Sequence, residues 1–256
     1  MQTDSALGRA VAVVRDLRER CPWDRAQTRD TLRPYLVEET LELDDALGGG
    51  DPAAIREELA DLLLNIAFQL VIAEDLGEFT ADDVATTLEQ KMYRRHPHLF
   101  DLGPPESWEK SKAREQTGGM LAGLPPTLSP LLMAHRLQER AAAIGFDWPD
   151  AEGPLEKVRE ETSEVAAELE GGSRQQALTA EVGDLLFAVV NLARKAGVPP
   201  TTALDHANRK FRRRFEAVET MAQTRGLDLH DASLDQLDAI WDEVKEREKA
   251  GEPPYG

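Results

Sequence analysis

The chain has 256 residues, a formal net charge of −18 and one cysteine, Cys21. The negative charge argues against nucleic acid or an anionic membrane as a partner, because both are bound through an excess of Lys and Arg. A single cysteine excludes an intrachain disulfide and a thiolate metal site. The N-terminus carries no signal pattern, and the longest apolar run is interrupted by Asn65 and Gln69. We therefore expect a cytoplasmic protein without a membrane span.

Helical patterns account for the first half of the chain, and prolines mark their boundaries. Proline fits the first turn of a helix and blocks a helix further in. Pro22 therefore ends the first amphipathic stretch and Pro97 ends the fourth, while Pro34 and Pro52 suit first turns. The expected helices are residues 6–20, one opening at Asp30 or Thr31, one capped by Asp51, one capped by Thr80, and a short one over residues 108–114.

A stretch rich in Gly and Pro, residues 116–130, predicts a linker between two domains, residues 1–115 and 131–249, with a disordered tail over residues 250–256. No segment shows a sustained alternation of period two, so we predict an all-α fold built from two tandem helical domains. Further helices are expected to start at Ser129-Pro130, Gly153-Pro154, Ser173, Thr201 or Thr202, and Ser233.

Two pairs of acids dominate the first half. Glu39 and Glu42 are three residues apart, as are Glu58 and Asp61, so each pair shares one helix face. The glycines at 48–50 turn one helix back on the other, which brings the four carboxylates together. Their mutual repulsion raises their pKa values or draws in a cation, and oxygen ligands alone suit Mg²⁺, or Mn²⁺ as an alternative.

The same spacing of acids occurs a second time in the chain. Glu161 and Glu164 precede Glu181 and Asp184, with 23 residues from the first acid to the last against 22 in the first copy. A single acidic motif in a chain with 48 acidic residues is usually a solvated helix face. Duplication at a matched distance favours two metal sites.

Basic residues follow the acids in both halves, and their spacing places each group on one helix face suited to phosphate oxygens. The first group is Lys91, Arg94 and Arg95, and the second is Lys210, Arg213 and Arg214. Trp108 with Lys112 and Trp241 with Lys245 come next. Each Trp suits base stacking or a place in a core or interface equally well.

These motifs resemble the MazG family of all-α nucleoside triphosphate pyrophosphohydrolases. The resemblance covers nearly the whole chain and includes CPWD at 21–24, RRHPHLF at 94–100, IGFDW at 144–148 and GDLLFAVVNLAR at 183–194. It implies cleavage between the α and β phosphates to give a nucleoside monophosphate and inorganic pyrophosphate. It also implies Mg²⁺ on the carboxylates and a homodimer that completes four-helix-type bundles.

The resemblance also implies roles for particular residues. The metal ligands fall on Glu161, Glu164, Glu181 and Asp184, and on Glu39, Glu42, Glu58 and Asp61 in the first copy. The nucleotide contacts fall on Lys157, Lys210, Arg213, Arg214 and Trp241, with Lys245 and, in the first copy, Lys91, Arg94 and Arg95 as further candidates.

The copies differ beside the acids. Lys157 lies four residues before Glu161, whereas Tyr35 holds that place before Glu39. Pro97 also cuts the first basic helix short. We therefore expect the second half to be the better catalyst.

A carboxylate beside the metal is needed to accept a proton from the attacking water. We nominate Glu160, and Glu38 in the first copy, although a structural role fits these positions equally well. The substrate range is expected to be broad or directed at unusual nucleotides, since the sequence fixes neither base nor sugar. The alternative function is a non-enzymatic helical module that binds a metal or nucleotide.

Overall fold

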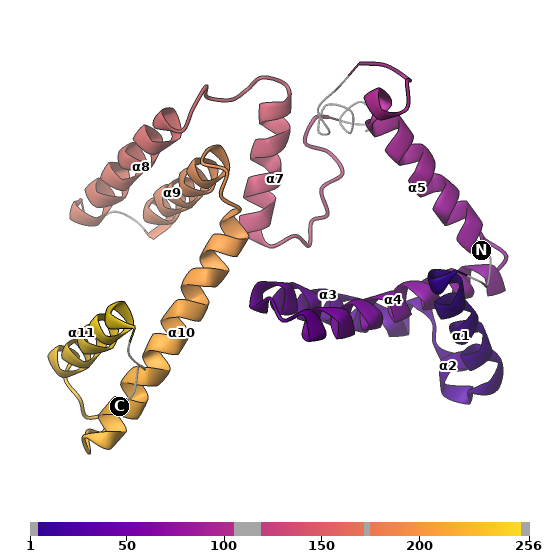
Figure 1. Cartoon of the computed structure of the whole chain (residues 1–256). Helices are drawn as coiled ribbons and strands as arrows, with labels where there is room; N and C mark the ends of the chain where they lie inside the picture. The colour runs from indigo at the N-terminus through magenta and orange to yellow at the C-terminus, as the bar shows by residue number, and fades with distance from the viewer. Residues whose placement is uncertain (1–4, 105–118, 172–174, 252–256) are drawn as a thin grey trace. The chain divides into compact units, whose positions relative to one another are not determined.

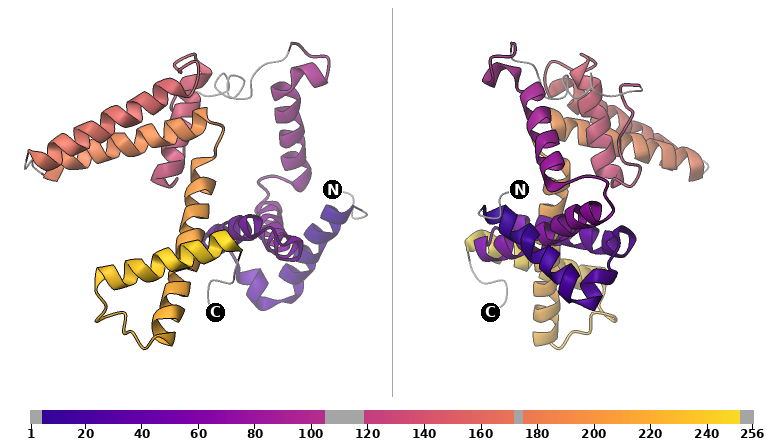
Figure 2. Two further views of the ribbon diagram at one scale, coloured as in Figure 1. Left: turned by 60° about the vertical axis from the view of Figure 1, so that its left-hand side comes forward. Right: turned by 90° about the vertical axis from the view of Figure 1, so that its right-hand side faces the viewer.

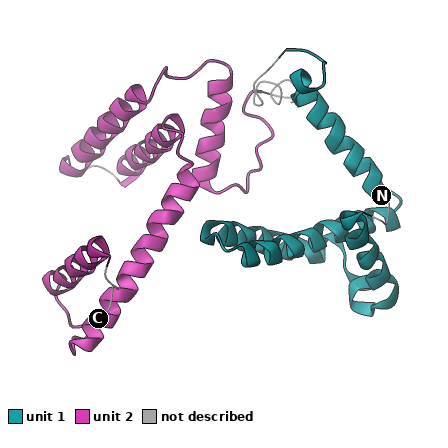
Figure 3. Cartoon of the chain, in the orientation of Figure 1, with its two compact units in different colours: residues 1–114 teal, residues 115–256 magenta. Residues whose placement is uncertain are grey.

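The computed structural model describes residues 5–104, 119–171 and 175–251 (Figure 1). The chain forms two compact units, residues 1–114 and 115–256 (Figure 3). The described residues fold into α-helices and one short 3₁₀ helix, with no strand among them. The all-α prediction is confirmed. The helix expected over residues 108–114 and the tail over 250–256 lie largely outside the described residues.

Unit 1 is a set of helices that follow one another closely. They are α1 (Ala6–Arg20), α2 (Pro22–Ala26), α3 (Arg29–Gly49), α4 (Pro52–Asp75), α5 (Ala81–Arg95) and the 3₁₀ helix η1 (Pro97–Leu99). The bounds of α1 and the N-caps Asp51 and Thr80 are as predicted. The five-residue helix α2 was not predicted, since it is too short to show a periodic pattern.

The start of α3 differs from the prediction. Its N-cap is Thr28, rather than Asp30 or Thr31, because the side chains of Thr28 and Thr31 form a reciprocal capping box. The helix therefore begins at Arg29, and Pro34 lies inside it rather than in its first turn.

Helices α3 and α4 form an antiparallel pair joined by a tight turn (Figures 1 and 2). Gly50 ends α3 with φ of +74°, a left-handed conformation that favours glycine, and its N–H donates to the carbonyl of Ala46. Asp51 then caps α4 by accepting from the N–H of Ala53. This turn sets the register between the two acid-bearing helices.

Helix α1 packs on the C-terminal half of α4 and provides the core of unit 1. Val11 and Val14 of α1 are buried against Phe68 and Val71 of α4 and Leu32 of α3. These side chains fill the space between the first helix of the unit and its long apolar helix.

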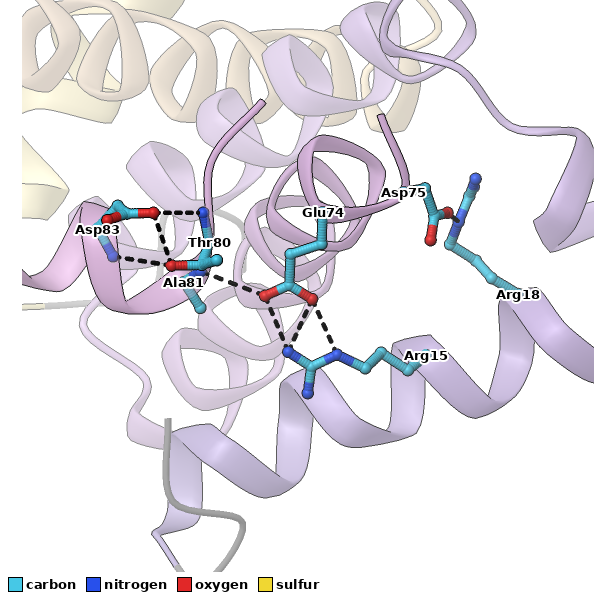
Figure 4. A network of polar contacts seen from close by, with 7 residues as sticks. All are labelled: Arg15, Arg18, Glu74, Asp75, Thr80, Ala81 and Asp83. Carbon is cyan, nitrogen blue, oxygen red and sulfur yellow. Dashed lines mark hydrogen bonds and ion pairs between the residues drawn. The ribbon is translucent and has the colours of Figure 1, made fainter. Parts of the chain in front are cut away.

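Ion pairs also join α1 to the end of α4 (Figure 4). The guanidinium of Arg15 donates to both carboxylate oxygens of Glu74, at 2.8–2.9 Å, and Arg18 donates to Asp75. Glu74 also accepts from the backbone N–H of Ala81, the first residue of α5. The network therefore joins α1 to the end of α4 and the start of α5.

Unit 2 begins with a helix that matches α1 in order along the chain. Its helices are α7 (Pro130–Ala143), α8 (Glu152–Glu170), α9 (Gln175–Lys195), α10 (Pro200–Thr224) and α11 (Leu234–Ala250). The caps Ser129 and Ser233 are confirmed. The predicted cap Ser173 lies outside the described residues.

Two helices of unit 2 start slightly earlier than predicted. Helix α8 begins at Glu152, so Pro154 is its third residue, and Pro200 rather than a threonine opens α10. Proline in a first turn forfeits no helical hydrogen bond, so both starts are consistent with its chemistry.

Helices α8 and α9 form an antiparallel pair like α3 and α4, while α11 lies along the C-terminal half of α10 (Figures 1 and 2). The buried core of the α10–α11 pair contains Ala217, Val218, Met221, Ile240 and Val244. Unit 2 therefore has its main core away from its acid-bearing helices.

Helix α9 is apolar, yet much of it faces outward. By length and composition it is the one helix among the described residues that is long and apolar enough to cross a membrane, and 17% of that window is buried. Val182, Leu186 and Val189 are exposed on it at spacings of four and three, which places them on one face. In α4, Leu59 and Ile66 are exposed at the positions matching Val182 and Val189.

The core of unit 1 predicts unequal effects for two neighbouring valines. Val14 is 1% exposed and Val13 is 56% exposed on the same helix. Val14→Ala should lower the free energy of unfolding of unit 1 by about 2 kcal/mol, through lost burial and a cavity. Val13→Ala should change it by less than about 0.5 kcal/mol. Hydrogen exchange of the α1 and α4 amides measures both, and equal effects would contradict this core.

Candidate metal and nucleotide site

The turn between α3 and α4 brings the acids of unit 1 together. Carboxylate oxygens of Glu39, Glu58 and Asp61 all lie within 4.8 Å of one another. Partial burial, and then the charges of Asp61 and Glu42, raise the pKa of Glu39. Burial and the charge of Glu42 likewise raise the pKa of Glu58. Glu42 therefore acts on the cluster although it is not one of its three closest members.

The acids of unit 2 cluster in the same way. Carboxylate oxygens of Glu161, Glu181 and Asp184 lie within 4.8 Å of one another. Glu161 is 4% exposed, so its carboxylate faces inward. Glu164 lies beside Glu161 and shares a hydrogen bond with it.

Lys157 gives the second cluster a cation that the first lacks. Its Nζ lies 2.6 Å from Oε1 of Glu161 and 2.9 Å from Oε1 of Glu160. The hydrogen bond that Lys157 donates lowers the pKa of Glu161. The hydrogen bond that Glu164 donates to Glu161, followed by burial and the nearby acids, raises the pKa of Glu164. Tyr35 stands at the matching place in unit 1 and is exposed.

Both clusters fit a hard divalent cation. Each cluster offers carboxylate oxygens from two helices, and neither contains a nitrogen or sulfur ligand. Such donor sets suit Mg²⁺ or Mn²⁺. A cation there would relieve the repulsion that adds to burial in raising the pKa values of Glu39 and Glu58 and to the Glu161 hydrogen bond in raising that of Glu164.

The two nominated proton acceptors lie at the edges of these clusters. Glu160 is exposed and accepts from Nζ of Lys157 at 2.9 Å. Glu38 is exposed on α3, and its charge raises the pKa of the adjacent Glu39. Their roles stay predictions.

The basic residues of α10 are held elsewhere within the subunit. Arg213 and Arg214 both pair with Glu248 of α11, with Arg214 Nη2 at 2.5 Å, and these contacts lower the pKa of Glu248. The guanidinium of Arg214 also lies 5.9 Å from the ring centroid of Trp241. Trp241 itself packs against Phe211 of α10, at 5.4 Å between centroids.

The remaining predicted nucleotide contacts are divided among three places. Lys245 pairs with Asp242 on α11, at 2.8 Å, and Lys210 lies on α10 one turn before Arg213 and Arg214. Lys91, Arg94 and Arg95 lie in the last turns of α5. Trp108 and Lys112 lie outside the described residues.

A cavity of about 390 Å³ opens beside the acids of unit 2. Lys157, Glu161 and Asp184 form one end of it, and helices α7, α8 and α9 provide the walls. Phe146 and Trp148, from the loop between α7 and α8, also line it. A polar, charged end and a largely apolar body are typical of sites for small organic ligands.

Ion pairs fix the loop that carries the two aromatic residues. Asp147 accepts from the guanidinium of Arg194 at 2.5 Å and from Nζ of Lys195 at 3.2 Å, and these contacts lower the pKa of Asp147. Lys195 also donates to the carbonyl of Trp148, at 2.6 Å. The IGFDW motif is therefore tied to the C-terminal end of α9.

Gly153, the second residue of α8, allows the Trp148 ring to lie against the helix start. A Cβ at position 153 would lie 2.1 Å from Cδ1 of Trp148, which is far inside contact distance. Sequence reasoning used this glycine only to mark a helix start, and it assigned no ligand contact to Gln138, Phe146 or Asn191 of the cavity. The motifs IGFDW and GDLLFAVVNLAR, which contain Phe146 and Asn191, were the signals that pointed to the cavity.

The fold and the paired carboxylate clusters define an all-α protein with two candidate sites for divalent cations. Comparison with protein families then gives a particular group. The model of the MazG nucleotide pyrophosphohydrolase domain matches residues 27–100 and again residues 151–219. The chain belongs to the MazG family. The match contains all eight acids predicted as metal ligands and ends before α11, which carries Trp241 and Lys245.

Individual relatives agree with this assignment. The chain is 41% identical over 243 residues to the nucleoside triphosphate pyrophosphohydrolase/pyrophosphatase MazG of Thermotoga maritima, covering 92% of this chain and 94% of that protein. It is 38% identical over 247 residues to the nucleoside triphosphate pyrophosphohydrolase of Escherichia coli K12, with the same coverage. A protein of that name from Mycobacterium tuberculosis is 42% identical over 147 residues, covering 54% and 45%.

The close approach at Gly153 predicts opposite outcomes for two glycines. Alanine is the better helix former by about 1 kcal/mol, so Gly183→Ala on α9, where a Cβ meets nothing within 4 Å, should stabilise unit 2. Gly153→Ala should instead displace the Trp148 ring and destabilise the start of α8. Urea unfolding and Trp emission report both, and a stabilising Gly153→Ala would contradict the packing.

The Asp147 contacts predict a pH-dependent contribution to stability. Because Arg194 and Lys195 lower the pKa of Asp147, its contribution is complete above the unfolded value near 3.9 and is lost as the pH falls through the lower folded value. Asp147→Asn should therefore cost about 1–2 kcal/mol at pH 6, and this difference should shrink below about pH 4. Urea unfolding at both pH values tests it, and a difference that grew on acidification would contradict it.

Proposed function

We propose that the chain hydrolyses nucleoside triphosphates to nucleoside monophosphate and diphosphate, with Mg²⁺ held by the acid clusters. The observation that carries the proposal is the convergence of Glu161, Glu181 and Asp184 beside Lys157 at one end of a ligand-sized cavity. Family membership and relatives named for this reaction support it. The cytoplasm, where nucleoside triphosphates are made and used, is the proposed location.

Different residues of unit 2 are proposed to bind the metal, contact the phosphates and accept the proton. Glu161, Glu164, Glu181 and Asp184 would hold Mg²⁺, which supplies charge neutralisation for the triphosphate and orients the attacking water. Lys157, already 2.6 Å from Glu161, is positioned to contact a phosphate oxygen. Glu160, exposed beside Lys157, would accept the proton of the attacking water. The nucleotide would thus contact an acid-bound cation and a lysine at once.

The two units are proposed to differ in activity. Glu39, Glu42, Glu58 and Asp61 form a cluster with the donor set for Mg²⁺, and Glu38 is placed like Glu160. Unit 1 has no lysine at the place of Lys157, since Tyr35 stands there. Its cluster therefore binds a cation without the adjacent phosphate contact, which supports a weaker or regulatory site.

A homodimer is the proposed assembly. The exposed apolar face of α9 recurs on α4 at matching positions, and α10 exposes Leu204, Phe211 and Phe215. Apolar surface of this extent on neighbouring helices is typical of an interface. A second subunit on the faces of α8 and α9 would complete a four-helix-type bundle.

The same dimer would account for the remaining cations. Within one subunit, Arg213 and Arg214 pair with Glu248. Lys210, Arg213, Arg214, Trp241 and Lys245 are therefore proposed to reach the nucleotide from the partner's α10 and α11, with Lys91, Arg94 and Arg95 as the counterparts in the first copy.

Product analysis tests the reaction. The full chain incubated with each common nucleoside triphosphate should release the nucleoside monophosphate and inorganic pyrophosphate when Mg²⁺ or Mn²⁺ is present. Neither product should form when both cations are absent. Release of nucleoside diphosphate and orthophosphate would mean that the nucleotide is cleaved at another bond and would contradict the proposal.

Paired substitutions test the difference between the units. Glu161→Gln with Glu164→Gln should lower turnover about 100-fold or more, because isosteric amides remove charge from the cluster that faces Lys157. The matched pair Glu39→Gln with Glu42→Gln should have a smaller effect. The reverse order would show that unit 1 carries the reaction.

Sedimentation equilibrium tests the assembly. The full chain should sediment as a dimer, and Val189→Lys should shift it toward the monomer because it places a charge in the exposed apolar face of α9. Leu234→Lys, at an exposed position that starts α11, is the control and should leave the dimer intact. A wild-type monomer would be the contrary result.

A further inference from the structure

The body of the unit 2 cavity extends away from the acids and is lined by two exposed aromatic side chains. Trp148 is 41% exposed although one edge of its ring lies against Gly153, and Phe146 is 77% exposed. Phe187 of α9 lines the cavity as well. Flat aromatic surfaces around a largely apolar space suit a planar ring. Of the charged lining residues, Lys157, Glu161 and Asp184 belong to the acid cluster. Arg194 also lines the cavity and donates to Asp147 and Asn191.

Gln138 of α7 places an unsatisfied acceptor in the wall of this cavity. The side chain is 6% exposed, and its Nε2 donates to the carbonyl of Phe187 at 2.8 Å. A carbonyl only accepts, so the amide must present its nitrogen there, and Oε1 is the atom left over. That oxygen is buried and has no hydrogen-bond partner. A buried acceptor of this kind favours a ligand that brings an N–H donor.

Asn191 of α9 offers the complementary group. Its Oδ1 accepts from Nε and Nη2 of Arg194, at 2.9 and 2.8 Å. A guanidinium only donates, so these bonds fix the oxygen toward Arg194 and leave the NH₂ group for another partner. Asn191 is buried and lines the same cavity as Gln138. The wall therefore holds one fixed acceptor and one fixed donor.

Unit 1 fills the matching region with side chains. Counted from the last acid of each cluster, Asn191 corresponds to Phe68 and Arg194 corresponds to Val71. Phe68 and Val71 are buried in the core of unit 1, packed with Val11 and Val14 of α1. At these two positions, polar side chains beside the cavity stand where unit 1 has core residues.

We propose that this cavity is the nucleobase pocket of unit 2, with Trp148 and Phe146 contacting the ring, Gln138 Oε1 accepting a base N–H, and Asn191 donating to a base acceptor. The inference rests on the proposed function for its substrate class, and it adds the residues that contact the base. The common bases each carry an N–H donor and an acceptor on one edge. The pocket therefore suits nucleotides in general, and its discrimination depends on how each edge meets Gln138 and Asn191.

The position of the pocket also distinguishes Trp148 from Trp241, although both side chains suit base stacking. Trp241 packs against Phe211 and Arg214 on the α10–α11 pair, whereas Trp148 lines the cavity next to the acids. Gln138, Phe146 and Trp148 lie outside the residues matched by the family model, which start again at residue 151. Base contacts in this chain are thus proposed to come partly from outside the conserved domain pattern.

Tryptophan fluorescence of the full chain tests the pocket without any hydrolysis. One variant keeps Trp148 and carries Phe at the other three tryptophans, and its counterpart keeps Trp241 alone. Adenosine, guanosine, cytidine and uridine monophosphates are titrated into both. At least one monophosphate should quench the emission of Trp148, because a base that stacks on an indole changes its emission. None should quench Trp241 at a lower concentration than it quenches Trp148.

Two substitutions in the Trp148-only chain complete the test. Gln138→Met should weaken binding of the tightest monophosphate about tenfold, because the base N–H then enters a buried site without an acceptor. Phe146→Ala, at a position too exposed to affect folding, should weaken it severalfold or more through lost contact with the ring. Gln223→Met, at an exposed position of α10, is the control and should leave the affinity unchanged.

The outcomes separate this inference from the proposed reaction. Absence of quenching by all four monophosphates, quenching of Trp241 alone, or full affinity in both pocket variants would overturn the base pocket. If the chain binds monophosphates at Trp148 but releases no diphosphate from triphosphates, the pocket stands and the proposed reaction fails. Normal hydrolysis with unaltered base affinity in Gln138→Met and Phe146→Ala would leave the reaction and remove the pocket.

Discussion

Repulsion among carboxylates that two antiparallel helices hold together is the constraint on which this structure depends. Each hairpin places three acid side chains with oxygens within 4.8 Å of one another, and among the described residues Lys157 is the cation that forms an ion pair with one of them. Burial raises the pKa values of Glu39 and Glu58, and the hydrogen bond with Glu161 raises that of Glu164, while repulsion from the neighbouring acids adds to the shift in each case. Packing of apolar helix faces offsets this repulsion, and a divalent cation would remove it. A cluster under such repulsion is prepared for a metal and for the phosphates that accompany it.

Duplication has given one fold two environments. In unit 1 the space between the first helix and the long apolar helix is a packed core around Phe68. In unit 2 the corresponding space is a cavity with Gln138 and Asn191 in its wall, while the main core lies between α10 and α11. Lys157 adds a cation beside the acids in unit 2 alone. The same hairpin thus stabilises one unit and, in the other, leaves room for a ligand.

The sequence was sufficient for the parts of the structure that local chemistry determines. The acid spacing predicted both clusters, and caps such as Asp51, Thr80 and Ser233 marked helix starts because each satisfies its own neighbouring N–H groups. The Thr28 capping box was missed because Asp30 and Thr31 are equally good caps by type. The cavity was beyond reach, since Gln138 and Phe187 are 49 residues apart and meet only through packing. The outward pairing of Arg213 and Arg214 with Glu248 depends on tertiary structure in the same way.

Binding of Mn²⁺ to the full chain, followed by electron paramagnetic resonance, tests the central claim most directly. The account predicts that Glu161→Gln with Asp184→Asn weakens one class of bound Mn²⁺ at least about tenfold. Glu156→Gln with Glu170→Gln, which replaces two exposed acids of α8, should leave binding unchanged. Equal Mn²⁺ binding by the wild type and the cluster variant would contradict the view that these carboxylates are held together for a cation.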